Sequence, residues 1–448
     1  MKQKWGLVIA VAWGLGALFL AGCSISTGLK KKPVSIPASS GALERTPQYR
    51  AGGWIIARAA MHNHTVYSDG CRSPEDLLEL ARREGMAVLA FNDHREGKIC
   101  GGKHQLVCGK VNGIESVGYD AYYDHLRRIQ SQAQSQGMIV LKGIEVIPYF
   151  YNYGKSPHLV LNGLQEHFTV YGVEDTAVFK NMPVRNTITF KPEPIPDEKP
   201  WAKFVDYLVG QGAIVHAVHV DEGADMWYGP AHGACPPVPE NLHRLKNLTD
   251  FSVLPYAWHE HTGGPGGLWD TDLLEYQAGL RQKPLWATAD ADYHCESSLA
   301  IATTLLYLRE FTEADIYQAL REGRMVALQG DAFQNTYVAE WWVSDREKPE
   351  DPVMLGRTAR LAGAPVVRFA LDHPVPDCRV RLIRNGVVVL DQPGAEFTYR
   401  DQELGTRREP AFYRVEVSGP IADRKDYDGP TMPASELFVN PIFVRFAP

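Results

Sequence analysis

The feature that most constrains the fold is a series of apolar segments, each of which ends in histidine or a carboxylate. The first segment leads into His62 and His64, and Asp69 and Gly70 follow. On a β-strand, residues two apart point to the same face, so His62 and His64 can bind one ion together. The turn residues 68–70 can bring the carboxylate of Asp69 back toward that ion. A single His-x-His pair would favour two surface histidines, but this pair is one of several such strand ends.

The same pattern recurs further along the chain. Residues 86–94 end in Asp93 and His94, and residues 138–145 end in Glu145. Residues 284–294 end in Asp292 and His294, and residues 212–219 contain His216 and His219. His158 begins a further segment at 158–161. Nine of the fifteen histidines lie in or just past predicted strands, at positions 62, 64, 94, 158, 216, 219, 259, 261 and 294. A metal centre at the strand ends of a barrel would produce this clustering.

Segments of helical period separate these strands from about residue 52 to residue 331. Residues 73–85, for example, have Ser73 as an N-cap, Pro74 at the first helical position and Gly85 at the end. Alternation of this length predicts an α/β fold in which parallel strands form a sheet or barrel. Long insertions follow the predicted strands, at about 96–117, 148–157, 165–199, 222–238 and 259–269. In a barrel, that face carries the catalytic residues.

After residue 331 the hydrophobic period changes to the alternation typical of strands. Asn385 and Gly386 stand between two such segments, which is a strong signal for a tight hairpin. Residues 332–448 are therefore predicted to form a small all-β sandwich. This part shows no cluster of ionisable groups, which favours a packing or spacer role.

The N-terminus has the pattern of a lipoprotein signal peptide over residues 1–23. A basic start and an apolar stretch lead to Leu20-Ala-Gly-Cys23, which resembles the bacterial lipobox, in which the cysteine is lipidated. The alternative is an uncleaved membrane anchor. Residues 24–51, rich in Ser, Pro, Gly and Lys, are predicted to be a flexible tether. These features predict a lipid-anchored protein of the bacterial cell envelope that faces the periplasm or the exterior, and Ser24 favours an outer membrane.

Charge and cysteine content limit the partners and the compartment. A net charge of −7 and the lack of long Lys/Arg runs argue against a nucleic-acid surface. Disulfides are permitted outside the cytoplasm. Cys100 and Cys108, which flank a Gly-rich loop, are favoured as a local pair, and the sequence leaves the remaining connectivity open.

The sequence resembles the PHP (polymerase and histidinol phosphatase) superfamily of metallohydrolases. The motifs that carry the resemblance are the His62-x-His64 opening with Ser68-Asp69-Gly70, the later Asp93-His94, Glu145 and His219 segments, and Asp292-x-His294. The resemblance covers residues 58–331. Together with the predicted export signal and the predicted C-terminal β-sandwich, these motifs are most similar to those of the branch that includes carbaryl-hydrolase-like proteins. The resemblance implies a distorted (β/α)7 barrel that holds two or three divalent ions such as Zn, Mn or Fe.

The ligand set that the resemblance implies has three parts. The first ion would be held by His62, His64, Glu145 and Asp292, the second by Glu145 with His158 and His219, and the third by Asp69, His94 and His294. One departure from the family pattern is Val220, where proline is usual after the His219 position. The pattern gives no firm role to His259 and His261. Because a Gly-rich loop surrounds them, they are predicted to contact substrate or to have a local structural role.

These features predict a metal-dependent hydrolase, a phosphoesterase that uses a metal-bridged hydroxide on a small or lipid-linked substrate outside the cytoplasm. Glu145 and Asp292 are the predicted catalytic residues. Arg95 follows a ligand directly and is a candidate for a phosphate oxygen, although a surface salt bridge is an equal alternative. Two other functions stay open, a metal-dependent amide, carbamate or ester hydrolase and a non-catalytic envelope-binding lipoprotein. The sequence indicates no obligate protein partner.

Overall fold

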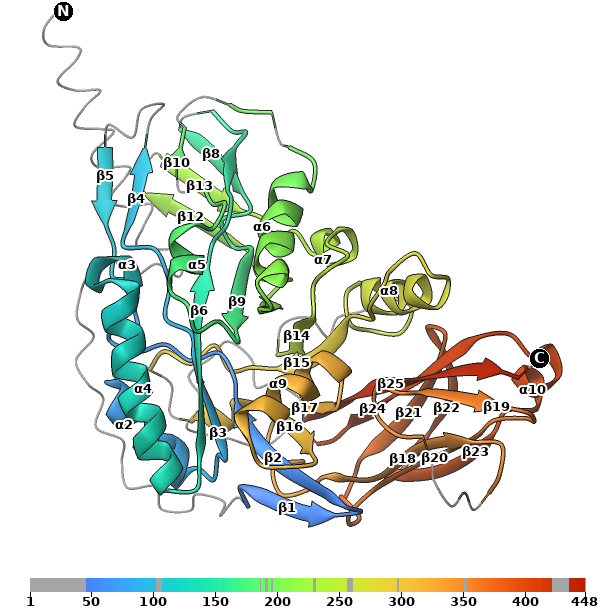
Figure 1. The fold of residues 1–448 in the computed structure, drawn as a ribbon. Coiled ribbons are helices and arrows are strands. Elements are labelled where there is room, and N and C mark those ends of the chain that lie inside the picture. The colour runs from blue at the N-terminus through green and yellow to red at the C-terminus, as the bar shows by residue number, and fades with distance from the viewer. Residues whose placement is uncertain are drawn as a thin grey trace, which may run out of the picture.

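The computed structural model describes residues 46–101, 107–155, 157–185, 187–189, 192–194, 196–228, 231–255, 261–295, 298–347, 349, 353–420 and 435–447. It is a mixed α/β protein with a large β-rich part, which is coloured orange to red in Figure 1. Cys23 and the predicted signal peptide and lipid anchor lie outside the described residues. Among the residues described, no helix combines the length and apolar character needed to cross a bilayer.

Seven strands in sequence order form the N-terminal half of the main sheet. They are β2 (Trp54–Ala60), β3 (Val88–Phe91), β6 (Ile139–Val146), β9 (His167–Tyr171), β11 (Ile214–Val218), β14 (Asp250–Leu254) and β15 (Trp286–Ala289). β2, β3 and β6 pair in parallel, as do β11, β14 and β15, whereas β9 runs antiparallel to both neighbours. All seven strands are buried along their length, as expected for strands covered on both faces.

Helices connect these strands and cover the sheet. They are α2 (Pro74–Arg83), α3 (Ile114–Val117), α4 (Tyr119–Ser135), α5 (Ala177–Lys180), α6 (Lys199–Gly210), α7 (Glu240–Arg244), α8 (Leu268–Gln277) and α9 (Glu313–Glu322), with a short 3-10 helix at Leu299–Ile301. As predicted, the Ser73 side chain caps α2 by accepting from the backbone N–H of Asp76. α4, the longest of these helices, runs beside β6 (Figure 1).

The insertions after the strands form two small sheets. One contains β4 (Lys98–Gly101), β5 (Val107–Lys110) and β10 (Thr187–Ile188), and the other contains β7 (Tyr151–Asn152), β8 (His158–Asn162), β12 (Ala224–Tyr228) and β13 (Ala231–Cys235). Both gather at one end of the main sheet, at the top of Figure 1. The predicted Cys100–Cys108 pair is confirmed, since a disulfide joins β4 to β5.

The predicted closed barrel of seven strands is not confirmed. Among the described residues no ladder joins β15 to β2, and the two segments meet only in an isolated bridge between Asn63 and Tyr293. The reason is that the antiparallel strand β16 (Ala302–Leu308) occupies the edge of β2. The Thr304 hydroxyl of β16 bonds the backbone of Ala289, so β15 approaches this edge through a side chain.

The C-terminal part is a sandwich whose strands pair in antiparallel fashion, except for the parallel pair of β19 and β25. One face is β18 (Val338–Ser344), β20 (Val366–Leu371) and β23 (Glu396–Arg400), followed by α10 (Gln402–Arg407), and the other is β19 (Thr358–Leu361), β21 (Arg379–Arg384), β22 (Val387–Pro393), β24 (Ala411–Ser418) and β25 (Glu436–Phe446). Trp341, Phe369 and Val380 belong to the core between them. The predicted hairpin at Asn385 and Gly386 is confirmed, and both residues have positive φ, of 51° and 82°.

The two parts of the chain share one sheet. β25 pairs through residues 436–439 with β17 (Met325–Gln329), which in turn pairs with β16. The Asn440 side chain bonds the backbone of Ala287 and Met325, so it satisfies polar groups of both β15 and β17. The short strand β1 (Gln48–Ala51) completes this sheet against β2.

Candidate metal centre

Three of the predicted ligands sit just past their strands in an unusual backbone conformation. His62 follows β2 with φ of 59°, His219 follows β11 with φ of 34°, and Asp292 follows β15 with φ of 47°. The left-handed region costs a non-glycine residue on the order of 1 kcal/mol or more, and it persists where function or packing requires it. Here it directs three side chains into one place.

The first group of donors consists of His62, His64, Glu145 and Asp292. The Nε2 atoms of the two histidines lie 3.1 Å apart, and each lies 3.2 Å from Oδ1 of Asp292. His62 Nε2 also lies 3.2 Å from Oε1 of Glu145, and His64 Nε2 lies 3.3 Å from Oε2. Atoms that share one ion at about 2.1 Å are roughly 3.0–3.4 Å apart. The spacing therefore fits a single divalent ion.

Glu145 is also the centre of a second group. His94 Nδ1 lies 2.7 Å from Oε2 of Glu145, while His167 Nδ1 and His219 Nε2 lie 2.9 Å and 3.3 Å from Oε1. Burial alone would raise the pKa of Glu145, but His94, His62 and His167 outweigh it and hold that pKa well below its usual range. A carboxylate that stays ionised and faces histidines on all sides can bridge two ions.

A third group lies beside the first. His294 Nε2 is 3.1 Å from Oδ1 of Asp69, and His94 Nε2 is 3.7 Å from Oδ2 of Asp69. Ligand atoms of His64, Asp69, His94 and His294 all lie within 4.8 Å of one another. Burial would raise the pKa of Asp69, but His294 and His94 outweigh burial and hold it well below its usual range.

The hydrogen bonding of these residues indicates that a cation belongs between them. Several buried atoms have no hydrogen-bond partner among the described residues: His62 Nδ1, both ring nitrogens of His94, Asp69 Oδ1, Glu145 Oε2, His219 Nδ1 and Asp292 Oδ1. Buried polar atoms in proteins are rarely left without a partner. Imidazole and carboxylate together are the donor set that Zn, Mn or Fe prefers. The residues present therefore fit divalent metal ions.

His167 gives the sharpest indication. Its Nε2 lies 3.0 Å from the carbonyl oxygen of Leu164, to which it can only donate. In a neutral imidazole, Nδ1 then carries a lone pair, and that lone pair faces the Glu145 carboxylate at 2.9 Å. Two acceptors at this distance require either a second proton on the ring or a metal ion.

A second layer of polar contacts surrounds the ligands. The Ser68 hydroxyl lies 3.1 Å from His64 Nδ1 and donates to Asp93 at 2.7 Å. On the other side, Asp290 lies 3.7 Å from His62 Nδ1 and 2.9 Å from His216 Nε2. Such outer partners fix the orientation of metal-binding histidines. His216 also bonds Asp250, so it is a buried, hydrogen-bonded histidine that lies outside the set of predicted ligands.

Eight of the nine predicted ligands come together, and the ninth does not. His158 lies on β8 in the small sheet of β7, β8, β12 and β13, which we call the capping sheet. It is exposed there, and its ring centre lies 5.6 Å from that of His232. It is therefore not a ligand of this centre, and the structure places His167 beside Glu145 and His219 instead. The sequence did hold a signal, because His167 opens a run of aromatic and β-branched residues that ends at Gly172. The prediction treated that run as part of an insertion.

The other predicted site residues have different outcomes. Arg95 is buried and bonds Glu96, Glu115 and the Tyr119 hydroxyl, so it is a structural cation and not a ready phosphate ligand. His261 is 64% exposed, and its nearest charged partner is Glu240 at 3.7 Å. His259 lies outside the described residues.

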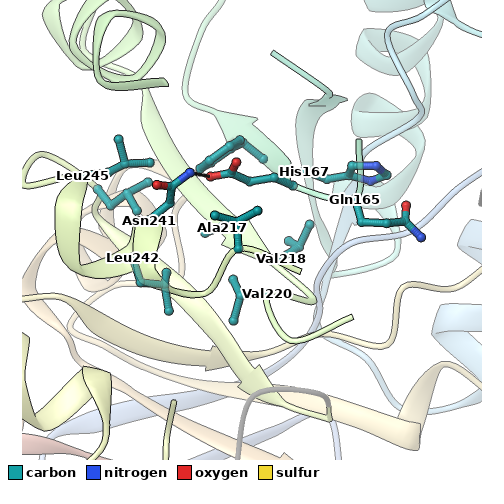
Figure 2. Close-up of a pocket in the computed structure, with 12 residues that line it drawn as sticks. Gln165, His167, Ala217, Val218, Val220, Asn241, Leu242 and Leu245 are labelled. Carbon is teal, nitrogen blue, oxygen red and sulfur yellow. Dashed lines mark hydrogen bonds between the residues drawn. The ribbon is translucent and has the colours of Figure 1, made fainter. Parts of the chain in front are cut away.

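A small cavity lies between β9, β11 and α7. Figure 2 shows Asn241, Leu242 and Leu245 on one side of it and Ala217 and Val218 on the other. Its volume is about 10 Å³, which is about the space of one water molecule and too small for a substrate. The cavity is therefore a packing feature of the strand that presents His167.

Comparison with known proteins identifies part of the chain. Residues 60–173 match the family model of the PHP domain, and this segment contains six of the donors named above. The chain therefore carries a PHP domain. No curated protein matches it in sequence.

The similar solved structures include three of low identity to this chain. A two-domain protein from Bacteroides vulgatus with a predicted PHP-like metal-dependent phosphoesterase is 13% identical over 89% of this chain and 99% of its own, with a TM-score of 0.39. A protein from Bifidobacterium adolescentis named as a metal-dependent phosphoesterase is 15% identical over 53% of this chain and 87% of its own, with a TM-score of 0.28. An amidohydrolase from Chromobacterium violaceum is 13% identical over 53% and 88%, also with a TM-score of 0.28. These values are too low to transfer an activity to this chain.

Proposed function

We propose that this protein is a metal-dependent hydrolase, and that it acts as a phosphoesterase on a small or lipid-linked substrate outside the cytoplasm. The observation that carries the proposal is the set of buried and half-buried donors around Glu145, from His62 to His294, in which several buried atoms have no hydrogen-bond partner among the described residues. The PHP domain match over residues 60–173 supports the same reaction class.

The charge of the centre supports an anionic substrate. Its carboxylate ligands are Asp69, Glu145 and Asp292, which carry three negative charges. Three divalent ions carry six positive charges, so a centre loaded with three ions keeps a net positive charge even when it also holds a hydroxide. A phosphate ester would be attracted to such a centre without an arginine.

Each residue has a defined role in this proposal. When bound, the ions would polarise the oxygen under attack and lower the pKa of a water molecule. Glu145 stays ionised between the histidines and holds two ion positions together. Asp292 would share an ion with His62 and His64, because its Oδ1 lies 3.2 Å from both Nε2 atoms. Ser68 orients the His64 imidazole through a hydrogen bond, and Asp290 lies near His62.

One observation favours a second candidate, a metal-dependent amide, carbamate or ester hydrolase. The cation predicted to bind phosphate, Arg95, is fully engaged by Glu96, Glu115 and Tyr119. A carbonyl substrate needs no such cation, and the same ions would polarise a carbonyl oxygen. A non-catalytic envelope-binding protein is less well supported, because it would be expected to lose ligands.

Two structural proposals accompany the function. The isolated bridge between Asn63 and Tyr293 supports a distorted barrel, in which the ends of β2 and β15 meet at the centre. The lipobox at Cys23 supports a lipid-anchored, exported protein, and the Cys71–Cys295 and Cys100–Cys108 disulfides are compatible with an oxidising compartment.

A substrate panel tests the proposal directly. Protein loaded separately with Zn, Mn or Fe would be assayed against aryl phosphomonoesters, phosphodiesters and aryl carbamates, with metal-free protein as the control. We expect metal-dependent turnover of a phosphate ester. Turnover of the carbamates alone would favour the second candidate, and no metal-dependent turnover of any ester would contradict both.

A further inference from the structure

The Cys71–Cys295 disulfide joins the two loops that carry Asp69 and His294. The two cysteines are 224 residues apart in the sequence, yet each stands within two residues of one of these donors. The backbone N–H of Cys71 also donates to the carbonyl oxygen of His294 at 3.1 Å. The covalent bond therefore lies directly beside the contact between Asp69 and His294.

The remaining donors do not depend on this bond. His62 and His64 are fully buried, and backbone bonds from Tyr293 to His62 and from His64 to Tyr293 tie their segment to the end of β15. Glu145 lies on β6 in the middle of the sheet. Asp69 and His294, by contrast, are partly exposed and belong to loops. The turn of Asp69 is closed at its own base by a bond from Val66 to Arg72. Its covalent tie to the His294 loop is the disulfide.

We propose that the Cys71–Cys295 disulfide is a positioning element for the ion held by Asp69, His94 and His294. This ion would bind tightly only in the oxidised protein, whereas the ion between His62, His64, Glu145 and Asp292 binds in either state. The proposal rests on the metal-dependent function above and deepens it. It also links completion of the centre to an oxidising compartment.

The redox step is a thiol–disulfide exchange. A dithiol reductant donates two electrons and two protons, the Cys71–Cys295 bond breaks to give two thiols, and the dithiol becomes a cyclic disulfide. Both cysteines are partly exposed, so a small reductant can reach them. Once the bond is broken, the two loops are held together by noncovalent bonds, which include the backbone bond from Cys71 to His294 and the bond from the Arg72 side chain to the Tyr293 hydroxyl. The distance between Asp69 and His294 is then less well fixed.

The test measures metal binding and not only turnover. Wild-type protein and the variant Cys71→Ser/Cys295→Ser would be titrated with Zn²⁺ and Mn²⁺ by calorimetry, with bound metal counted by elemental analysis after dialysis. We expect the weakest of the bound ions to lose affinity by about 10-fold or more, as for loss of an outer partner of a metal ligand. The tightest ion should be unchanged. Asp69→Asn serves as a reference, because it removes a ligand of the same ion and should lower the same equivalent.

The matched control is Cys100→Ser/Cys108→Ser, which removes the other disulfide of the described chain, between β4 and β5. It should bind metal as the wild type does. If circular dichroism shows that the Cys71/Cys295 variant does not fold, reduced wild-type protein is used instead. It is reduced with a dithiol, and the dithiol is then removed in the absence of oxygen. Equal stoichiometry and affinity with and without the Cys71–Cys295 bond would overturn the inference, as would an equal loss in the Cys100/Cys108 control. A wild-type protein that binds no ion would instead contradict the proposed function itself.

Discussion

The molecule contains two clusters of buried charge that are built in opposite ways. Where α8 meets the sandwich, Arg414 makes two bonds to Asp270, at 2.6 Å and 2.8 Å, and a third to Glu416 at 2.5 Å. All three side chains are buried, and the guanidinium lies 4.6 Å from the centre of the Trp269 ring. At the metal centre, by contrast, carboxylates and imidazoles face one another, and several of their atoms have no hydrogen-bond partner among the described residues.

The difference shows how to separate a structural charge cluster from a functional one. Asp270 has a cation supplied by the chain, so the Arg414 cluster is complete as it stands. Glu145 is surrounded by histidines that need either protons or metal ions to face it. Burial therefore does not distinguish the two clusters. The clusters differ in the source of their positive charge, which the chain supplies at Asp270 and a metal ion would supply at Glu145.

The largest effect is expected for Glu145→Gln. The change keeps the shape of the side chain but removes the charge that holds two ion positions together, so bound metal should fall by at least one equivalent. Activity should fall by more than the roughly 100-fold typical of losing an outer partner, while circular dichroism shows an intact fold. His216→Ala is the control, since this histidine bonds Asp250 and Asp290 and is expected to lower stability without removing metal. Full metal content in Glu145→Gln would contradict a bridging role.

Next in size is Arg414→Leu, which should lower the free energy of unfolding by about 3–5 kcal/mol, because it leaves Asp270 charged and buried. Metal stoichiometry should stay at the wild-type value. Arg407→Leu removes an exposed i,i+4 pair with Glu403 and should change the free energy of unfolding far less. Urea unfolding gives the free energy of unfolding of each variant, and elemental analysis gives its metal content. Loss of metal in the Arg414 variant would show that the two clusters are coupled.

A smaller effect on activity and metal binding is expected for a change at His167, and His158 serves as its control. His167→Ala should reduce activity by roughly 10–100-fold and weaken metal binding, because it removes a donor 2.9 Å from Glu145. His158→Ala should have wild-type metal content, since His158 is exposed on β8. Calorimetric titration of both variants with the same metal decides between them. The opposite result would restore the original prediction for His158.

The smallest effect concerns pH. Burial, and then the nearby Glu416, raise the pKa of Glu436 to about 7. The folded protein therefore keeps a proton on Glu436 that the unfolded chain releases near its ordinary value of 4.5. This contribution to stability is present at low pH and is lost as pH rises through about 7. In Glu436→Gln, the change in the free energy of unfolding between pH 5 and 8 should be smaller by on the order of 1 kcal/mol, measured by urea unfolding. An unchanged pH slope would show that Glu436 is ionised in the folded protein.

The sequence predicted much of the centre because its donors lie at the ends of apolar segments. His62, His64, His94 and Asp292 follow buried strands, Glu145 lies near the end of β6, and parallel neighbours bring such ends together. His158 was misassigned because its segment has the same apolar pattern but pairs within the capping sheet. The pattern identifies a strand but not the strand beside it.

Other features depend on contacts that no local pattern records. Arg95 follows a ligand, yet its direction is set by Glu96 and Glu115 in the insertion after β3. Likewise, the pairing of β25 with β17 joins residues more than a hundred positions apart, so a change of hydrophobic period at residue 331 could not indicate that the two parts share a sheet.

Anomalous X-ray diffraction from crystals of the metal-loaded protein, recorded on both sides of the metal absorption edge, tests the metal centre most directly. We expect an anomalous peak about 2.0–2.3 Å from Nε2 of both His62 and His64, and a second peak shared by Glu145, His167 and His219. Clear density for these side chains with no anomalous peak among them, in crystals soaked at saturating metal, would contradict this expectation.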